Sequence, residues 1–329
     1  MTAEFHTLND DHSSRAVTTD AWRALQPFRE AGGLGFHNFA IPEVRERYVA
    51  SCAANGLSET TDPATRDITV DDFQVRLYLP QGTDPAQARR AILFIHGGGW
   101  LMGNLETHDS AARRLAVLTG LPTVAVDYRL APEQLYPAAI DDCRAALRWL
   151  LDSDAEHGLS VDSVCVAGDS AGGQLAAVLA NEDAASGTGA VDSQVLIYPI
   201  TDCSTERTEK GASYQRIESG FPLSADTMRW FIDTYLPEGQ DRTVPDLSPL
   251  LHPLPEGVAR AFVITMDNDP LADEGIEYAA ALAKAGVDVE FKHLRGYHHG
   301  LFTSAGVMKR GEEELAAIAH FIVKEGEQR

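Results

Sequence analysis

A serine between two glycines marks the point where an apolar run meets a helix-forming stretch. Residues 164–168 are apolar, Ser170 lies in the Gly-x-Ser-x-Gly turn that follows, and residues 174–180 favour a helix. In this context a serine occupies a strained turn that points its hydroxyl out of the sheet. The glycines are needed because a Cβ there would collide with the neighbouring strand and helix. The pattern predicts a nucleophile at Ser170, although the motif alone also fits an ordinary glycine-rich turn.

A run of three glycines follows another apolar stretch, residues 91–95. It lets the backbone turn with its N–H groups exposed, and such donors can hold the oxyanion of a tetrahedral intermediate. An ordinary glycine-rich loop is the alternative, and a phosphate loop is disfavoured because no Lys-Ser/Thr pair and no close helix start follow. We expect His96 to brace this loop. The predicted oxyanion hole comprises Gly97, Gly98, Gly99 and Ala171, the residue after the serine.

Two aspartates follow the late apolar run 261–265 and compete for the role of a catalytic acid. Asp269 precedes a proline, which keeps it extended and outside the coming helix. Asp267 is the alternative. Asp273 and Glu274 instead suit the first turn of that helix, where acidic side chains complement the helix dipole.

Two adjacent histidines lie in a glycine-flanked stretch near the end of the chain, residues 295–302. A histidine after the last strand fits the chain order of nucleophile, acid and base found in hydrolases with a serine elbow. We favour His299 because Gly300 relieves crowding beside it, and His298 is the alternative. The predicted triad is Ser170, Asp269 and His299.

The elements that must position these residues alternate between apolar strands and helices. Short β-branched runs separated by helices predict an α/β fold with a mainly parallel sheet and helices on both faces. Residues 202–250 contain no convincing sheet strand, so they are predicted to form a cap insertion. Residues 1–56 contribute further cap helices, and the catalytic domain comprises residues 57–201 and 251–329.

Composition excludes several classes of partner. The net charge of −22 argues against binding to nucleic acid or an anionic membrane. No stretch is apolar enough to span a bilayer and no leader is evident, so we expect a cytoplasmic protein. The four cysteines lack C-x-x-C spacing, which predicts free buried thiols, and no motif predicts a metal or cofactor.

Several ordered motifs together resemble the hormone-sensitive-lipase-like family of α/β-hydrolase esterases, in its GDSAG branch. They are residues 96–100, 127–133, 136–142, 168–173, 248–250, 269–274 and 299–300. The resemblance implies an α/β-hydrolase fold with an eight-stranded sheet and a helical cap. It implies the same triad, with Gly98, Gly99 and Ala171 as donors and Gly97 in support, and homodimers are frequent in the family. Asp267-Asn268 and Leu301 depart from the family pattern.

The resulting hypothesis is a serine carboxylesterase that hydrolyses short-to-medium-chain esters of small molecules through an acyl-enzyme, without metal or cofactor. An amidase or formamidase using the same triad is the alternative, and a non-catalytic small-ligand receptor is a third reading that the retained His299 disfavours. The side chains predicted to line an apolar substrate pocket are Trp100, Leu101, Met102, Phe221, Trp230 and Phe302.

Overall fold

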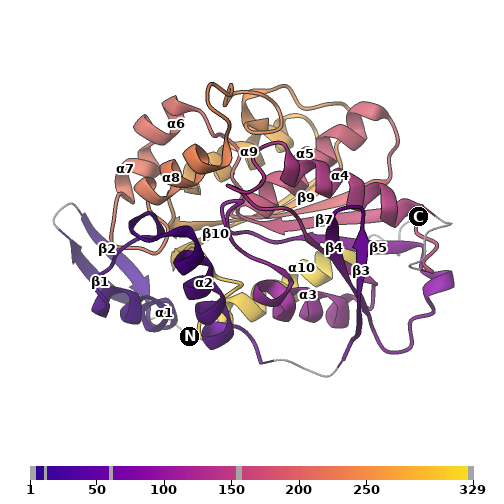
Figure 1. The fold of residues 1–329 in the computed structure, drawn as a ribbon, viewed down its shortest axis with the longest axis horizontal. Helices are drawn as coiled ribbons and strands as arrows, with labels where there is room; N and C mark the ends of the chain where they lie inside the picture. The colour runs from indigo at the N-terminus through magenta and orange to yellow at the C-terminus, as the bar shows by residue number, and fades with distance from the viewer. Residues whose placement is uncertain (1–4, 11–12, 59–61, 153–157, 325–329) are drawn as a thin grey trace.

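The centre of the molecule is one eight-stranded sheet (Figure 1). The computed structural model describes residues 5–10, 13–58, 62–152 and 158–324 of the chain. The strands of this sheet are β3 (Ala64–Val70), β4 (Phe73–Leu79), β5 (Arg90–Ile95), β6 (Thr123–Asp127), β7 (Ser163–Asp169), β8 (Val191–Ile197), β9 (Arg260–Asn268) and β10 (Val289–His298). Each strand predicted from an apolar or alternating run is present, so the predicted α/β class is confirmed.

The strand order β10-β9-β8-β7-β5-β6-β4-β3 brings the two glycine-containing motifs side by side. All neighbours are parallel except β3 with β4 and β4 with β6. The chain leaves β5 for β6 on one side and returns to β7 on the other, and crevices form where the connections diverge in this way. Because Ile95 pairs with Gly168, the loop after β5 and the turn after β7 are adjacent.

Helices cover both faces of the sheet (Figure 1). On one face lie α3 (Leu105–Thr119) and α10 (Arg310–Val323), and on the other lie α4 (Ala138–Leu151), α5 (Ala171–Ser186) and α9 (Ala272–Lys284). Alternate residues of β5 serve two cores: Leu93 and Ile95 belong to one, and Ile92 and Phe94 to the other. A strand buried on both faces has no polar alternation, which explains why residues 91–95 of β5 are all apolar.

Two further groups of elements lie near the carboxyl ends of the central strands. The first comprises a hairpin of β1 (Phe5–Asp10) and β2 (Ser13–Thr18), followed by α1 (Thr19–Glu30), the 3-10 turn η1 (Phe36–Asn38) and α2 (Ile41–Asn55). The second comprises α6 (Thr205–Lys210), α7 (Ala212–Arg216) and α8 (Ala225–Tyr235). The two groups meet where the rings of Phe36 and Phe231 lie 6.2 Å apart. The hairpin was not predicted. The sequence did predict that residues 202–250 contain no sheet strand, and the structure, which describes all of these residues, shows none there.

Two further observations concern the cysteines and the helices. The four cysteines, Cys52, Cys143, Cys165 and Cys203, are buried free thiols, as predicted. Within the described part of the chain, every helix is too short or too polar to span a bilayer. Residues 1–4 and 325–329, which the predicted cap and catalytic segments include, lie outside the described residues.

Candidate active site

Ser170 occupies a sharp turn between β7 and α5. Its backbone angles are φ 57° and ψ −119°, and its N–H donates to the carbonyl of Ile197 at 2.8 Å. A Cβ at Gly168 would lie 2.3 Å from the carbonyl oxygen of Gly172, and one at Gly172 would lie 2.0 Å from that of Ile95. These contacts leave no room for a side chain, so the predicted steric role of both glycines is confirmed. The strained serine conformation is the kind found at functional sites.

His299 and Asp269 lie next to each other although 30 residues separate them in the chain. The Nδ1 atom of His299 is 2.6 Å from Oδ2 of Asp269, and Oδ1 of Asp269 accepts the N–H of Leu271 at 2.9 Å. Asp269 is fully buried, while His299 is partly exposed to a cavity that Ser170 also lines. With Nδ1 donating to the carboxylate, Nε2 is the nitrogen left to exchange a proton with another group.

The alternative acid and base have other partners. Asp267 lies 3.7 Å from the Arg15 guanidinium and accepts the N–H of Gly296 at 3.3 Å. His298, the last residue of β10, places its ring nitrogens 2.8 Å from the carbonyl of His299 and 3.3 Å from that of Ala21. Burial lowers the pKa of His298 and so favours its neutral form. Within the described residues, neither alternative pairs with the side chain of a predicted triad member.

In the glycine loop after β5, one backbone N–H group has an acceptor and the next two do not, within the described residues. Gly97 donates its N–H to Oδ1 of Asp169 at 2.8 Å, so this donor is occupied. The N–H groups of Gly98 and Gly99, which line the cavity, have no acceptor within the described residues. Ala171 is the first residue of α5, and its N–H has no intrahelical acceptor for the same reason that any helix start has none. Among the described residues, the N–H groups of Gly98, Gly99 and Ala171 beside Ser170 therefore have no acceptor.

His96 holds the glycine loop from behind, in line with its predicted role. Its Nδ1 lies 2.8 Å from the carbonyl oxygen of Gly97, and its ring stacks on Tyr128 at a centroid distance of 4.2 Å. Burial, with a smaller contribution from His108, lowers the pKa of His96 to about 3. A neutral imidazole has a single N–H, which this geometry assigns to Nδ1.

The cavity beside Ser170 has a volume of about 500 Å³ and mostly apolar walls. Five segments build it: α1 through α2, the glycine loop with Met102, the serine turn at residues 169–170, residues 222–231, and residues 298–304. Of the side chains predicted to line a pocket, Met102 lies in its wall. Trp100 and Leu101 are instead fully buried in the core, where the indole of Trp100 stacks on Tyr235 and donates to Gln174. Phe221, Trp230 and Phe302 are likewise not among the residues that line this cavity.

Aromatic side chains that the sequence reasoning did not select form much of the wall. They are Phe28, Phe36, Phe39, Tyr48 and Phe231. Phe231 directly follows the predicted Trp230, and its ring lies against Gly99, where a Cβ would be 2.4 Å from the ring. The amphipathic pattern of the helices was a usable signal for Phe231, since neighbouring residues of a helix face different directions.

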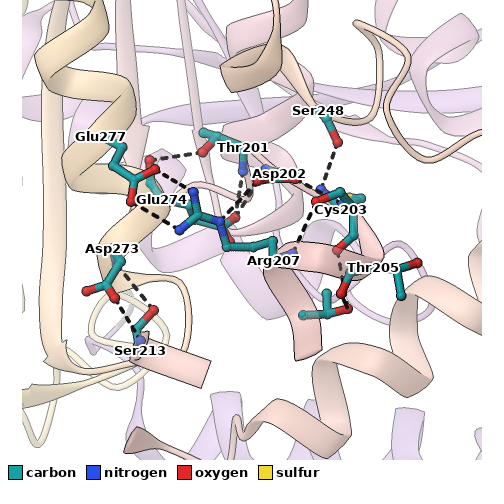
Figure 2. Close-up of polar contacts among 12 residues, drawn as sticks. Thr201, Asp202, Cys203, Thr205, Arg207, Ser213, Ser248, Asp273, Glu274 and Glu277 are labelled. Atoms are coloured by element: carbon teal, nitrogen blue, oxygen red, sulfur yellow. Dashed lines mark hydrogen bonds and ion pairs between the residues drawn. The ribbon is translucent and has the colours of Figure 1, made fainter. Parts of the chain in front are cut away.

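Buried polar contacts fix the segment that carries the acid (Figure 2). Ser213 donates its N–H to Asp273 at 2.7 Å and its hydroxyl to the carbonyl of Pro270 at 2.6 Å. In the same turn of α9, Oε1 of Glu274 accepts the N–H of Thr201 at 2.8 Å, while Oε2 is buried without a partner. Burial raises the pKa of Glu274 well above its ordinary range, which favours the protonated form of this carboxyl.

Comparison with known proteins shows the family to which this chain belongs. A family model described as alpha/beta hydrolase fold matches residues 92–303. The chain belongs to this family, which includes the hormone-sensitive-lipase-like esterases. An ethyl acetate hydrolase of Pseudomonas putida is 37% identical over 297 residues, which cover 88% of this chain and 92% of that protein. An arylesterase of Saccharolobus solfataricus is 28% identical, with 91% of this chain and 97% of that protein covered.

Solved structures give the same result over nearly the whole chain. An esterase from Pyrobaculum calidifontis superimposes with a TM-score of 0.83 at 33% identity, covering 94% of this chain and 99% of that one. A thermostable esterase from Pseudomonas putida superimposes with a TM-score of 0.86 at 27% identity, covering 96% and 98%. The α/β-hydrolase fold expected from the sequence is confirmed, and the chain is a carboxylic ester hydrolase of the serine type.

Proposed function

We propose that Ser170, His299 and Asp269 form the catalytic triad of an esterase for short-to-medium-chain carboxylic esters. The observation that carries the proposal is the 2.6 Å contact between Asp269 and Nδ1 of His299, with His299 and Ser170 in the wall of one cavity. The unoccupied N–H groups of Gly98 and Gly99 line that cavity too. These groups suit the roles of nucleophile, base, orienting acid and oxyanion donors, which supports the proposal.

The first half of the reaction acylates the serine. Nε2 of His299 takes the hydroxyl proton of Ser170 while Oγ forms a bond to the ester carbonyl carbon. Asp269 accepts the Nδ1–H throughout, which fixes the tautomer and stabilises the imidazolium. When the tetrahedral intermediate collapses, the carbon–oxygen bond to the alcohol breaks and Nε2 delivers the proton to the leaving alcohol.

The second half returns the enzyme to its starting state. Water attacks the acyl-enzyme while Nε2 of His299 accepts its proton. The bond between the carbonyl carbon and Oγ of Ser170 then breaks, the carboxylic acid leaves, and the proton returns to the serine. No metal or cofactor takes part in these steps.

We assign the oxyanion to the N–H groups of Gly98, Gly99 and Ala171, with Gly97 in support because its own N–H is occupied by Asp169. Each such donor typically contributes ~10²–10³ in rate. The N-terminus of α5 adds its positive dipole end at the same place.

The size and lining of the cavity support the proposed substrate range. A volume of about 500 Å³ with aromatic walls suits a small ester with an apolar acyl or alcohol group. The similarity to an ethyl acetate hydrolase and to an arylesterase supports small esters as well. A panel of chromogenic esters of increasing acyl length, with the matching amides, measures this range and tests the amidase alternative directly.

The triad is tested by replacing its nucleophile. Ser170→Ala should abolish ester hydrolysis, and a serine-reactive organophosphate should label Ser170 in the wild-type protein. Ser51, which lies in the same cavity wall on α2, provides the control: Ser51→Ala should retain both activity and labelling. Labelling at Ser51, or full activity in Ser170→Ala, contradicts the proposal.

We further propose that the protein acts in the cytoplasm and as a homodimer. Four buried free thiols support a reducing compartment, and the dimer is supported by the family resemblance. Cell fractionation tests the location, and analytical ultracentrifugation of the purified protein tests the oligomeric state.

A further inference from the structure

A second histidine–carboxylate pair lies directly behind the nucleophile, and the mechanism above does not use it. Nε2 of His108, on α3, is 3.1 Å from Oδ1 of Asp169, the residue before Ser170. Both side chains are buried. Nδ1 of His108 lies 2.9 Å from the hydroxyl of Thr107, so both ring nitrogens face polar atoms of the protein. A pair buried in this way needs a structural or catalytic reason, because burial of charged and polar groups is costly.

Asp169 is tied to the oxyanion loop as well as to His108. Its Oδ1 accepts the N–H of Gly97 at 2.8 Å, and its Oδ2 lies 3.4 Å from the hydroxyl of Tyr198. The carbonyl of the same peptide group, that of His96, accepts the hydroxyl of Tyr128 at 2.9 Å. The peptide that joins residues 96 and 97 is therefore held at both its N–H and its C=O.

The next peptide group carries the first unoccupied donor. It joins the carbonyl of Gly97, which is held by Nδ1 of His96 at 2.8 Å, to the N–H of Gly98. In a planar trans peptide the C=O and N–H point in opposite directions. Fixing the Gly97 carbonyl on His96 therefore directs the Gly98 N–H the other way, and Gly98 lines the cavity.

Steric contacts leave this loop little freedom to adjust. A Cβ at Gly97 would be 2.6 Å from Oδ2 of Asp169, so the loop backbone lies directly against the carboxylate. A Cβ at Gly103 would be 2.5 Å from the carbonyl oxygen of Gly97 and from Nδ1 of His96. The two held peptides are thus packed from both sides as well as hydrogen bonded.

We propose that Asp169 and His108 are positioning residues that hold the oxyanion donors of the glycine loop in their catalytic orientation. The proposal rests on the proposed function, because it concerns the same ester hydrolysis. Preorganised donors stabilise a developing oxyanion more than donors that must reorient during the reaction. Loss of this support should therefore slow the chemical step more than it weakens substrate binding.

The charge state of Asp169 fits this role. Burial by itself raises the pKa of this carboxyl, but His108, the Gly97 N–H and His299 outweigh burial, and the pKa of Asp169 is lowered overall. An ionised carboxylate accepts a shorter and stronger hydrogen bond from a backbone N–H than a neutral group does. His108 contributes to keeping that carboxylate ionised in a buried site.

The experiment compares variants by kcat, by KM and by inhibition with an alkylboronic acid, which forms a tetrahedral adduct with the serine. Asp169→Ala should lower kcat by ~10²–10³, the typical effect of losing an oxyanion donor. KM should stay within about threefold, because ground-state binding does not use the donors to the same extent. Affinity for the boronic acid should fall by the same factor as kcat/KM.

His108 supplies a second test that leaves the serine elbow unchanged. His108→Phe keeps an aromatic ring but removes the nitrogen that lies 3.1 Å from Oδ1 of Asp169, and it should lower kcat by about tenfold, the effect of weakening the support of a buried carboxylate. His108→Gln can place an amide N–H near the position of Nε2 and should restore most of that loss. Asp192, a buried carboxylate paired with Arg90 at the opposite end of the sheet, provides the control: Asp192→Asn should leave kcat unchanged.

The outcomes separate the two proposals. Unchanged kcat and boronic acid affinity in Asp169→Ala and His108→Phe, with Ser170→Ala inactive, overturn the positioning role and leave the triad intact. If Asp169→Ala does not fold, the two His108 variants decide the question. The positioning role is also contradicted if His108→Gln does not restore the kcat lost in His108→Phe. It is contradicted as well if Asp192→Asn shows the same loss of kcat. Full activity in Ser170→Ala overturns both proposals.

Discussion

Two histidine–carboxylate pairs flank one serine, and they differ mainly in what surrounds the imidazole. In the pair His299–Asp269 the ring is 14% exposed, and Nε2 has no partner within the described residues. In the pair His108–Asp169 the ring is 2% exposed, and both nitrogens lie close to polar protein atoms. A histidine can transfer protons to a substrate only if one nitrogen reaches it. The same residue types therefore suit proton transfer in the first pair and structural support in the second.

The elements that carry the pairs reinforce this difference. His299 directly follows β10, and Asp269 directly follows β9, so both lie at the carboxyl edge of the sheet where the cavity opens. His108 lies in the first turns of α3, packed between Phe94, His96 and Tyr48. Site residues of α/β proteins gather at the carboxyl edge because the loops there are free to vary. A helix interior instead fixes its side chains against the core.

The largest expected effect separates the acid of the first pair from its neighbour in sequence. Asp269→Asn should lower kcat by ~10⁴, because the imidazole then loses the partner that fixes its tautomer. Asp267→Asn, two residues earlier, should change kcat little, since Asp267 interacts with Arg15 and Gly296. Steady-state kinetics on one chromogenic ester measures both. A large loss in Asp267→Asn with a small one in Asp269→Asn reverses the assignment.

A double variant tests whether the two pairs act on different parts of the reaction. Removal of a triad member leaves the residual catalysis of the oxyanion hole. Asp169→Ala should therefore slow the residual reaction of His299→Ala by ~10², close to its effect in the wild-type background. Asp269→Asn should add little to His299→Ala, because those two residues act as a unit. If Asp169→Ala does not slow the residual reaction of His299→Ala any further, Asp169 acts in the same unit as the triad.

A buried carboxyl without a histidine partner sharpens the contrast through protein stability. The pKa of Glu274 is raised above its ordinary value of 4.5 by burial, so the folded state keeps a proton that the unfolded chain releases. The free energy of unfolding therefore falls as pH rises above about 4.5, by up to about 1.4 kcal/mol per pH unit for one proton. Glu274→Gln resembles the protonated acid and lacks this dependence. Its stability relative to the wild type should increase with pH.

Chemical denaturation between about pH 5 and about pH 7 measures that difference. Glu277, half-exposed on the same helix and paired with Arg207, offers the matched control variant Glu277→Gln. A stability difference for Glu274→Gln that stays constant with pH contradicts the protonated state. So does an equal pH trend in Glu277→Gln, because that carboxylate lies near the surface.

The sequence predicted the sheet and the first pair for physical reasons that did not apply to the second. Strands such as β5 are buried on both faces and are therefore continuous apolar runs. His299 and Asp269 follow strands in a fixed chain order and are flanked by glycine or proline. His108 lies inside a helix, 61 positions before Asp169, and its meeting with that carboxylate depends on how α3 packs on the sheet. No short sequence pattern predicts how α3 packs on the sheet.

Two other features were missed for related reasons. The hairpin β1–β2 is short and rich in polar residues, and it is anchored by a contact remote in sequence, the 2.7 Å hydrogen bond from Arg15 to Asn268. The cavity wall depends on where η1 and α8 meet, which sequence periodicity does not specify. Trp100 was predicted to line the pocket because it follows the glycine loop. Its ring is instead buried in the core, where the indole N–H donates to Gln174.

The N-terminal segment supplies a large share of the cavity wall, from Ala24 to Asn55, but none of the proposed triad or oxyanion donors. Much of the wall that contacts a substrate would therefore come from a stretch of chain separate from the proposed catalytic groups. Mutations before residue 56 are expected to change which esters fit the cavity and to leave the proposed catalytic groups in place. Exchanging residues 24–55 between related enzymes is therefore expected to change substrate selectivity. The proposed catalytic groups would still come from the protein that receives the segment.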